Sequence, residues 1–496
     1  MNTSDFTRRE FFTTAASGLG GVALTSLLDQ QGAFAAGRQT LAAGAAVNPL
    51  ASKAGHFPAK AKSCIFIFLA GAPSQLDLFN YRPELQKLDG QKMPESLSEG
   101  VRFAFIQKDT ATLMAPSRRF TQHGQSGMWF SDLVPHIASC ADDICMINTM
   151  HTDQFNHHPG QLMMQCGQAR FGLPAMGSWL SYGLGTGNQN LPSYVVLTSG
   201  RGSSGGATLW SSGYLPSVHA GVLLRNQGPP ILDLENPAGL PPALQRKGLD
   251  VLRELNQRRY EQVHDPEIAS RIANYEMAFR MQTEAPALTD LSTETKRTLD
   301  EYGVNRPEPE ERGNRTGSGE QFKSFATNCL LARRMVESGV RFINIIFASW
   351  DHHSDLNQGL RYNATMIDQP IAALIKDLKQ RGLLEETLVV CGGEFGRTPL
   401  GENRPGDRDV SGRDHHPYAF SMFLAGGGFR GGYTYGETDE IGWSPVRDPV
   451  HINDLQATML RQFGINHLKL TYPYQGVDLR LTNITRESHV IDALVA

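Results

Sequence analysis

The sequence lacks several of the motifs from which an activity is usually inferred. None of its six cysteines forms a C-x-x-C pair, so a zinc site built from thiolates is not expected. It contains no G-x-x-x-x-G-K-S/T phosphate-binding loop, and no G-x-G-x-x-G follows its first apolar run. The net charge is only −4, which gives no reason to expect a nucleic acid partner. These absences direct attention to the histidines and carboxylates.

The N-terminus has the features of an export signal. Residues 7–12 read TRREFF, a Gly/Ala-rich apolar stretch follows at 16–28, and an A-x-A end lies at 33–35. This order predicts a twin-arginine signal over residues 1–36, followed by a flexible linker over 37–60. The alternative is a chance arginine pair on a membrane anchor, but the apolar stretch is short and glycine-rich for a span. We therefore expect passage through the Tat translocase, a periplasmic or secreted location, and no stable transmembrane segment after cleavage.

The composition is that of a folded protein with a large core. Apolar residues make up 40% of the chain and charged residues 19%. Cys64 and Cys391 lie in apolar runs and are expected to be small core residues. Cys140 and Cys145 could form a disulfide in an oxidising compartment, and the sequence leaves their pairing open.

Apolar strands alternate with amphipathic helices along most of the chain. Short buried strands are predicted at Ile65–Leu69, Phe342–Phe347 and Leu388–Cys391, the last two preceded by helices that end at a glycine. This alternation predicts βαβ units and an α/β fold with a mostly parallel central sheet. We expect one α/β domain over 61–490, with a helical insertion around 240–320.

Three polar segments follow predicted strands or approach their ends. They are WDHHSD at 350–355, GGEFGRTP at 392–399 and GRDHHP at 412–417, the last expected to arrive from a loop. Ligands of open α/β sheets gather outside the carboxyl ends of the strands. The predicted ligands of one divalent ion, with Zn, Mn, Fe and Ca all open, are Asp351, His353, Glu394 and His415, with Asp77 as a weaker candidate.

Other side chains of these segments suit an anionic ester. Arg397 and Arg413 could clamp a phosphate or sulfate through paired donors. Asn156 and His157 stand at the predicted start of a helix, where an anion is favoured. His157 or His416 is the predicted catalytic base. The alternative for each histidine and carboxylate is a structural polar network that caps turns and binds backbone carbonyls.

The chain also resembles a known family. Phrases such as AGAPSQLDLF, MHTDQFNHHPGQLMMQCG, GGEFGRTP and GRDHHPYAFSMFLAGGG are similar to the exported bacterial family called domain of unknown function 1501 (DUF1501), over roughly residues 60–480. That family is similar to sulfatases and belongs to the alkaline phosphatase superfamily. The resemblance implies a three-layer sandwich, with metals at the strand ends.

The resemblance also exposes departures from the sulfatase-like pattern. Glu394 falls at a metal-binding aspartate position, whereas Phe395 falls where a metal-binding histidine would be, and phenylalanine cannot coordinate. His157 lies near the position of the nucleophile, where no Cys, Ser or Thr is present. The first strand ends without an aspartate, and Asp77 comes several residues later. At most one metal site of a two-metal hydrolase is expected to remain.

Two principal hypotheses follow. The first is an exported metal-dependent hydrolase of sulfate or phosphate esters, including sulfated polysaccharide, that uses a metal-bound water. The second is a catalytically degenerate periplasmic binding or assembly protein on the same fold. A third, weaker hypothesis is a structural role at the cell surface. An open coordination position favours the first, and a site filled by Phe395 and internal salt bridges favours the second.

Overall fold

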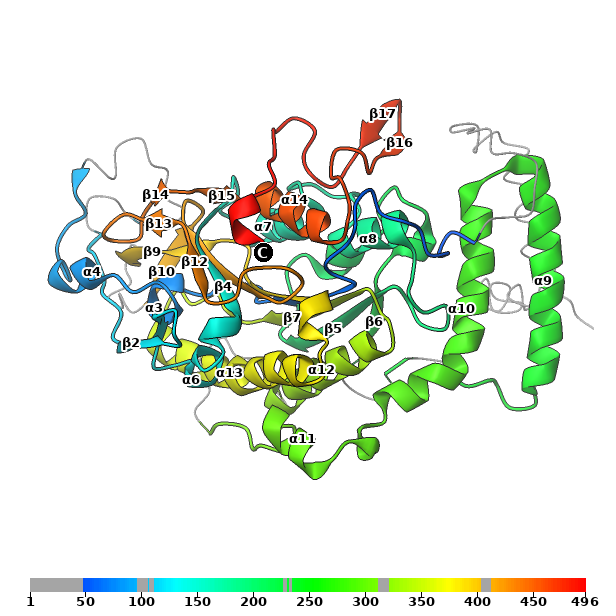
Figure 1. Ribbon diagram of the computed structural model, residues 1–496, viewed down its shortest axis with the longest axis horizontal. Helices are drawn as coiled ribbons and strands as arrows, with labels where there is room; N and C mark the ends of the chain where they lie inside the picture. Colours follow the sequence, from blue (N-terminus) through cyan, green and yellow to red (C-terminus); the bar gives the residue numbers. More distant parts are fainter. Residues whose placement is uncertain are drawn as a thin grey trace, which may run out of the picture.

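A nine-stranded sheet forms the centre of the molecule, which is represented by a computed structural model (Figure 1). The main path of the sheet runs β12-β4-β11-β8-β1-β7-β5-β6, and β15 also pairs with β4. All pairs are parallel except those of β11 with β4 and β8. The strands are β1 (Ser63–Phe68), β4 (Ile144–His151), β5 (Tyr194–Gly200), β6 (Val222–Leu224), β7 (Phe342–Ala348), β8 (Thr387–Gly392), β11 (Phe420–Ala425), β12 (Tyr433–Tyr435) and β15 (Val450–His451). The predicted mostly parallel α/β sheet is confirmed.

The structure describes residues 48–95, 106, 111–225, 230–231, 234–310, 321–402 and 412–496. The predicted export signal at 1–36 and the first part of the predicted linker at 37–60 lie outside these residues. Within them, no helix has the length and apolar character that crossing a membrane requires.

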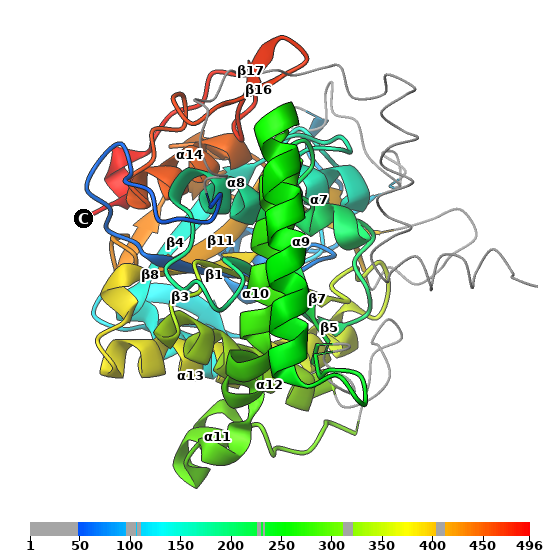
Figure 2. The same cartoon turned by 90° about the vertical axis from the view of Figure 1, so that its right-hand side faces the viewer.

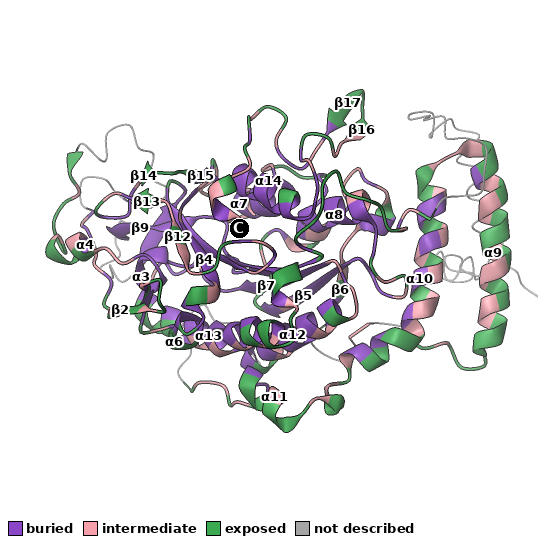
Figure 3. Cartoon of the chain, viewed as in Figure 1, coloured by how far each residue is buried: buried purple, intermediate pink, exposed green. Residues whose placement is uncertain are grey.

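Helices cover both faces of the sheet, so the molecule has the three layers that the resemblance implies (Figure 1). One face carries α7 (His157–Cys166), α8 (Met176–Leu184) and α14 (Ile452–Gln462), and the other α6 (Pro135–Ala138), α12 (Gln321–Glu337) and α13 (Leu356–Gln380). Successive residues of β1 point to opposite faces of the sheet. Phe66 therefore belongs to the core on the α7–α14 side, and Ile67 to the core on the α12–α13 side. Burial on both faces explains why the central strands are continuous apolar runs (Figure 3).

The predicted helical insertion contains a long hairpin at one end of the molecule (Figures 1 and 2). It consists of α9 (Pro242–Val263) and α10 (Pro266–Thr289), and α11 (Lys296–Tyr302) follows it. On α10, Ala273, Met277 and Met281 pack with Val218 and Leu50 of the body. The remaining described α-helices and strands are short: α3 (Gln75–Leu78), α4 (Pro83–Lys87), β2 (Phe120–His123), β3 (Met128–Ser131), β9 (Gly396–Gly401), β10 (Arg413–His416), β13 (Glu437–Thr438), β14 (Pro445–Arg447), β16 (Tyr472–Tyr474) and β17 (Val477–Leu479).

Two local expectations need correction. GRDHHP is not a loop, because Arg413–His416 forms β10, which pairs antiparallel with β9. Cys140 and Cys145 do not pair, and all six cysteines are buried free thiols. Cys140 belongs to the core on the α12–α13 side of the sheet and Cys145 to the core on the α7–α14 side, so the sheet separates them.

Candidate functional site

The polar segments meet where the predicted parallel strands end. Asp351 and His353 follow β7, and Glu394 follows β8. His157 begins α7 after β4, and His415 lies on β10, opposite Arg397 of β9. Four segments distant in the sequence are thus brought to one edge of the sheet, as the carboxyl-end rule predicts.

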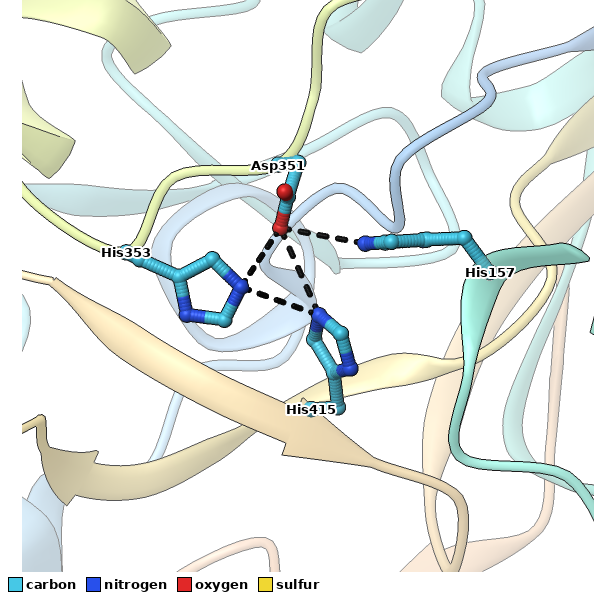
Figure 4. Close-up of side chains that lie close together, drawn as sticks. All are labelled: His157, Asp351, His353 and His415. Carbon is cyan, nitrogen blue, oxygen red and sulfur yellow. Dashed lines mark hydrogen bonds and ion pairs between the residues drawn. The ribbon is translucent and has the colours of Figure 1, made fainter. Parts of the chain in front are cut away.

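Four of these side chains converge on one point (Figure 4). The Asp351 Oδ1 atom lies 3.1 Å from Nε2 of His157, 2.8 Å from Nε2 of His353 and 3.4 Å from Nε2 of His415. The Nε2 atoms of His353 and His415 are 3.0 Å apart. One ligand atom from each of the four residues lies within 4.8 Å of the others, a spacing at which they could share a metal ion.

In each of the three imidazoles, the Nδ1 atom, which points away from the cluster, forms a hydrogen bond with an acceptor of the protein. The Nδ1 atom of His157 donates to Glu394 Oε1 at 2.7 Å, Nδ1 of His415 donates to the Phe155 carbonyl at 2.7 Å, and Nδ1 of His353 donates to Glu402. A carbonyl or carboxylate can only accept, so in each neutral ring Nδ1 carries the proton and Nε2 carries a lone pair. Carboxylate and carbonyl partners of this kind orient the histidine ligands of protein metal sites.

The donor set therefore fits a metal ion. Without a cation or a shared proton, the lone pairs of His353 and His415 would face each other at 3.0 Å, which is repulsive. Three imidazole nitrogens and one carboxylate oxygen suit zinc or another first-row transition metal better than calcium or magnesium, which prefer oxygen ligands. Burial lowers the pKa of His415 to about 3, which keeps this ring neutral as coordination requires.

The charges at the site favour an ionised Asp351. Burial alone would raise the pKa of the Asp351 carboxyl, but its contacts with the three imidazoles, which donate to it whenever Nε2 is protonated, and the positive charge of Arg397 together hold it well below its usual range. For His157, burial lowers the pKa, but the neighbouring carboxylates of Asp351 and Glu394 outweigh it, and the net shift is upward.

Glu394 supports the cluster from its side. The residue is fully buried, and its two oxygens accept from the backbone N–H of Gly71 at 3.0 and 3.2 Å. Its Oε1 also accepts from His157 and, at 3.2 Å, from Gln161 Nε2. These contacts direct its carboxylate at the ring of His157 and at the end of β1. The metal role assigned to Glu394 from the sequence stays a prediction.

The two predicted anion-binding arginines are buried and bonded within the protein. Arg397 donates to the carbonyls of Gly71, Ala72 and Arg413, and its Nη2 also donates to Asp351 Oδ1 at 2.8 Å. Arg413 donates from Nε to Asp77 Oδ2 at 2.8 Å, and from Nη1 to the Met114 and Thr398 carbonyls. Asp77 is thereby paired with Arg413 and lies outside the four-residue cluster.

The other predicted residues differ in how they face the site. His416 is buried, its Nε2 donates to the Trp443 carbonyl at 2.6 Å, and burial lowers its pKa to about 4. Asn156 is exposed at the N-cap of α7 and directly precedes His157 in the sequence. The ring of Phe395 packs against the rings of His157 and His415, with centroids 5.0 and 4.8 Å away.

Sequence reasoning missed three supporting groups: Glu402, Gln161 and the Phe155 carbonyl. Gln161 links Glu394 to a glycine- and serine-rich loop, because its Oε1 accepts from Ser204 Oγ and Gly205 N at 3.0 and 2.9 Å. Glu402 stands at the far end of β9, and its position opposite His353 depends on how the β9–β10 ribbon folds back. The only available signal was their position in the sequence: Gln161 lies within the phrase MHTDQFNHHPGQLMMQCG, and Glu402 comes shortly after GGEFGRTP.

The fold and the cluster define an α/β protein with a histidine-rich candidate metal centre at the carboxyl edge of its sheet. The chain belongs to the family described as "Protein of unknown function (DUF1501)", whose family model matches residues 61–495. No curated protein matches the sequence.

Several solved structures have a weak likeness to this chain. The lipoteichoic acid synthase LtaP from Listeria monocytogenes has 9% identity and a TM-score of 0.33, over 88% of this chain and 78% of that one. An alkaline phosphatase superfamily protein from Vibrio parahaemolyticus has 8% identity and a TM-score of 0.35, over 84% and 70%. A phosphonate monoester hydrolase from Silicibacter pomeroyi has 13% identity and a TM-score of 0.30, over 67% and 68%. The likeness is weak at these TM-scores, and the fold assignment rests on the strand order itself.

Proposed function

We propose that this protein is an exported, metal-dependent hydrolase of sulfate or phosphate esters. The observation that carries the proposal is the convergence of three Nε2 atoms on Asp351 Oδ1, with every Nδ1 atom already committed to an acceptor. The ester class comes from the resemblance of the sequence to sulfatase-like proteins. Export is supported by the arginine pair and the apolar stretch of the N-terminus.

In this proposal His157, Asp351, His353 and His415 hold the ion. The geometry of His157 favours a ligand over the base predicted from the sequence, because Glu394 fixes its Nδ1 and its Nε2 faces the cluster. A divalent ion bound there would polarise an ester oxygen and lower the pKa of a coordinated water.

The surrounding residues orient the ligands and restrict access. His353 and His415 are nearly buried, with side chains 7% and 4% exposed, whereas Asp351 and His157 are 28% and 19% exposed. A substrate would therefore approach from the side of Asp351 and His157. The ring of Phe395 packs against the rings of His157 and His415 and covers part of them with an apolar surface. Arg397 keeps Asp351 ionised and in place.

The second candidate function is that of a binding or assembly protein without catalysis. It is favoured by the packing of Phe395 against two of the rings and by the internal hydrogen bonds of Arg397 and Arg413. Both guanidinium groups bind backbone carbonyls and carboxylates of the protein, so neither is placed as the anion clamp that the sequence predicts. In this case a metal would serve structure or binding, and ester turnover would be absent.

The first experiment is elemental mass spectrometry on protein exported and purified without chelator or metal resin. We expect about one tightly held transition-metal ion per chain, lost in His415→Ala and Asp351→Ala and retained in His489→Ala, a matched change at an exposed histidine. Absence of stoichiometric metal in folded wild-type protein would refute the metallohydrolase. If metal is present, sulfate and phosphate monoesters are then assayed, and metal without any turnover would select the binding protein.

A further inference from the structure

The outer helix of the hairpin exposes an apolar stripe. On α9, Leu244, Val251 and Leu255 are 56%, 58% and 50% exposed. Together with Gly248 they are spaced 4, 3 and 4 residues apart, so they form one line along the helix, which we call the α9 seam. In the described chain α9 packs mainly against α10 (Figures 1 and 2). Its one buried residue is Tyr260, and most of the helix is exposed or half-buried (Figure 3).

No contact within the described part of the chain explains why residue 248 is a glycine. A glycine inside a helix is unfavourable by about 1 kcal/mol relative to alanine. A Cβ placed on Gly248 would meet nothing within 4 Å in the described structure, so packing within this part of the chain does not require a glycine at that position. A glycine in the middle of an apolar seam is instead what a closely approaching second helix requires.

The charges beside the α9 seam would be complementary between two copies of the helix. In a heptad with Gly248 and Leu255 at position a, Leu244 and Val251 occupy position d, and Lys247 and Glu254 both fall at position g. When two such helices pair antiparallel about a two-fold axis, Leu244 meets Leu255 and Gly248 meets Val251. Lys247 of each copy then faces Glu254 of the other, which gives two opposite-charge pairs by symmetry.

We propose that the α9 seam is the contact through which two copies of this protein form an antiparallel, two-fold dimer. The same surface patch serves both partners, so the interface closes and does not propagate into a fibre. Two heptads make a small interface, and interfaces below about 1,200 Å² are commonly weak, so the dimer is expected to be in concentration-dependent exchange with the monomer.

The test is sedimentation velocity of the full mature chain over roughly 1–100 μM, the range suited to a weak interface. We expect a monomer–dimer equilibrium whose dissociation constant rises about tenfold or more in Lys247→Glu, because Glu254 of the other copy then meets a like charge. The double variant Lys247→Glu/Glu254→Lys should restore wild-type association. Lys469→Glu, at an exposed lysine away from α9, is the matched control and should leave association unchanged.

A second variant separates association from folding. Gly248→Leu improves helix propensity and should maintain or raise the melting temperature, yet it should weaken the dimer because the leucine occupies the space of the facing Val251. A wild-type protein that stays monomeric over the whole range would overturn the proposal. So would a dimer that is indifferent to Lys247→Glu and Gly248→Leu, since its interface would then lie elsewhere.

Discussion

Replacing Glu394 by glutamine tests whether this residue binds the metal or supports a residue that does. The substitution keeps the shape of the side chain but removes its charge. The carboxylate accepts from three groups, namely His157 Nδ1, Gly71 N and Gln161 Nε2. At this fully buried position a glutamine offers one carbonyl oxygen with two lone pairs, and its NH2 group only donates, so at least one of the three N–H groups loses its acceptor.

The size of the effect follows from these contacts. Loss of a carboxylate behind a histidine ligand commonly lowers metal affinity about 10–100-fold, or about 1.4–2.7 kcal/mol. The unsatisfied buried donor should also lower the free energy of unfolding of the metal-free protein by about 1–3 kcal/mol. A direct ligand behaves differently, since its removal should abolish stoichiometric metal, as we expect for His415→Ala.

The assay is a competition titration with a chromophoric chelator, combined with urea denaturation of the metal-free protein. Glu394→Gln should retain one ion per chain at saturating metal but bind it 10–100-fold more weakly, by about the factor typical of a supporting carboxylate. Glu385→Gln, at an exposed carboxylate, is the control and should change neither quantity. Loss of metal as complete as in His415→Ala would show that Glu394 is itself a ligand, and unchanged affinity would show that it has no part in the site.

Three further predictions concern the support of the site and the pH dependence of the fold. Gly71→Ala should lower the free energy of unfolding by more than about 2 kcal/mol in urea denaturation, because Gly71 has a φ of 110° and its Cβ would lie 2.8 Å from Asp351 N. Asp77→Asn should cost about 3–5 kcal/mol in the same measurement, since it leaves the buried charge of Arg413 without its partner. Burial lowers the pKa of His219 to about 3, so the unfolded chain binds a proton below about pH 6.5 that the folded chain does not. The resulting loss of stability, about 2 kcal/mol between pH 6.5 and 4.5, should be absent in His219→Asn when unfolding is followed at both pH values.

Each of these predictions has a contradicting result. A Gly71→Ala protein as stable as wild type would show that the turn after β1 can relax around a side chain. An Asp77→Asn protein of undiminished stability would show that the Met114 and Thr398 carbonyls alone stabilise the guanidinium of Arg413. An unchanged pH slope in His219→Asn would assign the acid sensitivity to other groups.

Much of the fold could be predicted because it depends on local patterns. The runs that became β1, β7 and β8 are apolar on both faces, which is typical of central parallel strands, and the glycines before β7 and β8 separate them from the preceding helices. The β9–β10 ribbon was missed because its residues are polar and its strands are short. Its register, with His415 opposite Arg397, is fixed by packing against distant parts of the chain.

The site was predicted as a set of residues but not as an arrangement. Asp351, His353 and His415 lie together as expected, because their segments follow or approach neighbouring strand ends. The sequence predicts His157 as a base and Glu394 as a ligand. The geometry instead favours His157 as the residue that contacts the cluster directly, with Glu394 behind it. Residue type could not separate these roles, since both kinds of group bind metals and both accept or donate protons. The orientation of a ring is set by its second nitrogen, and that partner can come from any part of the chain.

The balance of charge around the cluster favours a cation over an anion as its ligand. The carboxylates of Asp351, Glu394 and Glu402 contact the three imidazoles, and the positive charge of Arg397 contacts Asp351. If the rings were neutral and the three carboxylates ionised, these four groups would carry two net negative charges in a largely buried space, which is unfavourable unless the charge is compensated. A divalent ion at the point where the Nε2 atoms meet would neutralise it and would also separate the facing lone pairs. A sulfate or phosphate group placed there without a metal would add negative charge to an already negative site. Any anionic ester should therefore bind only to the metal-loaded protein, whether the protein then cleaves the ester or merely holds it.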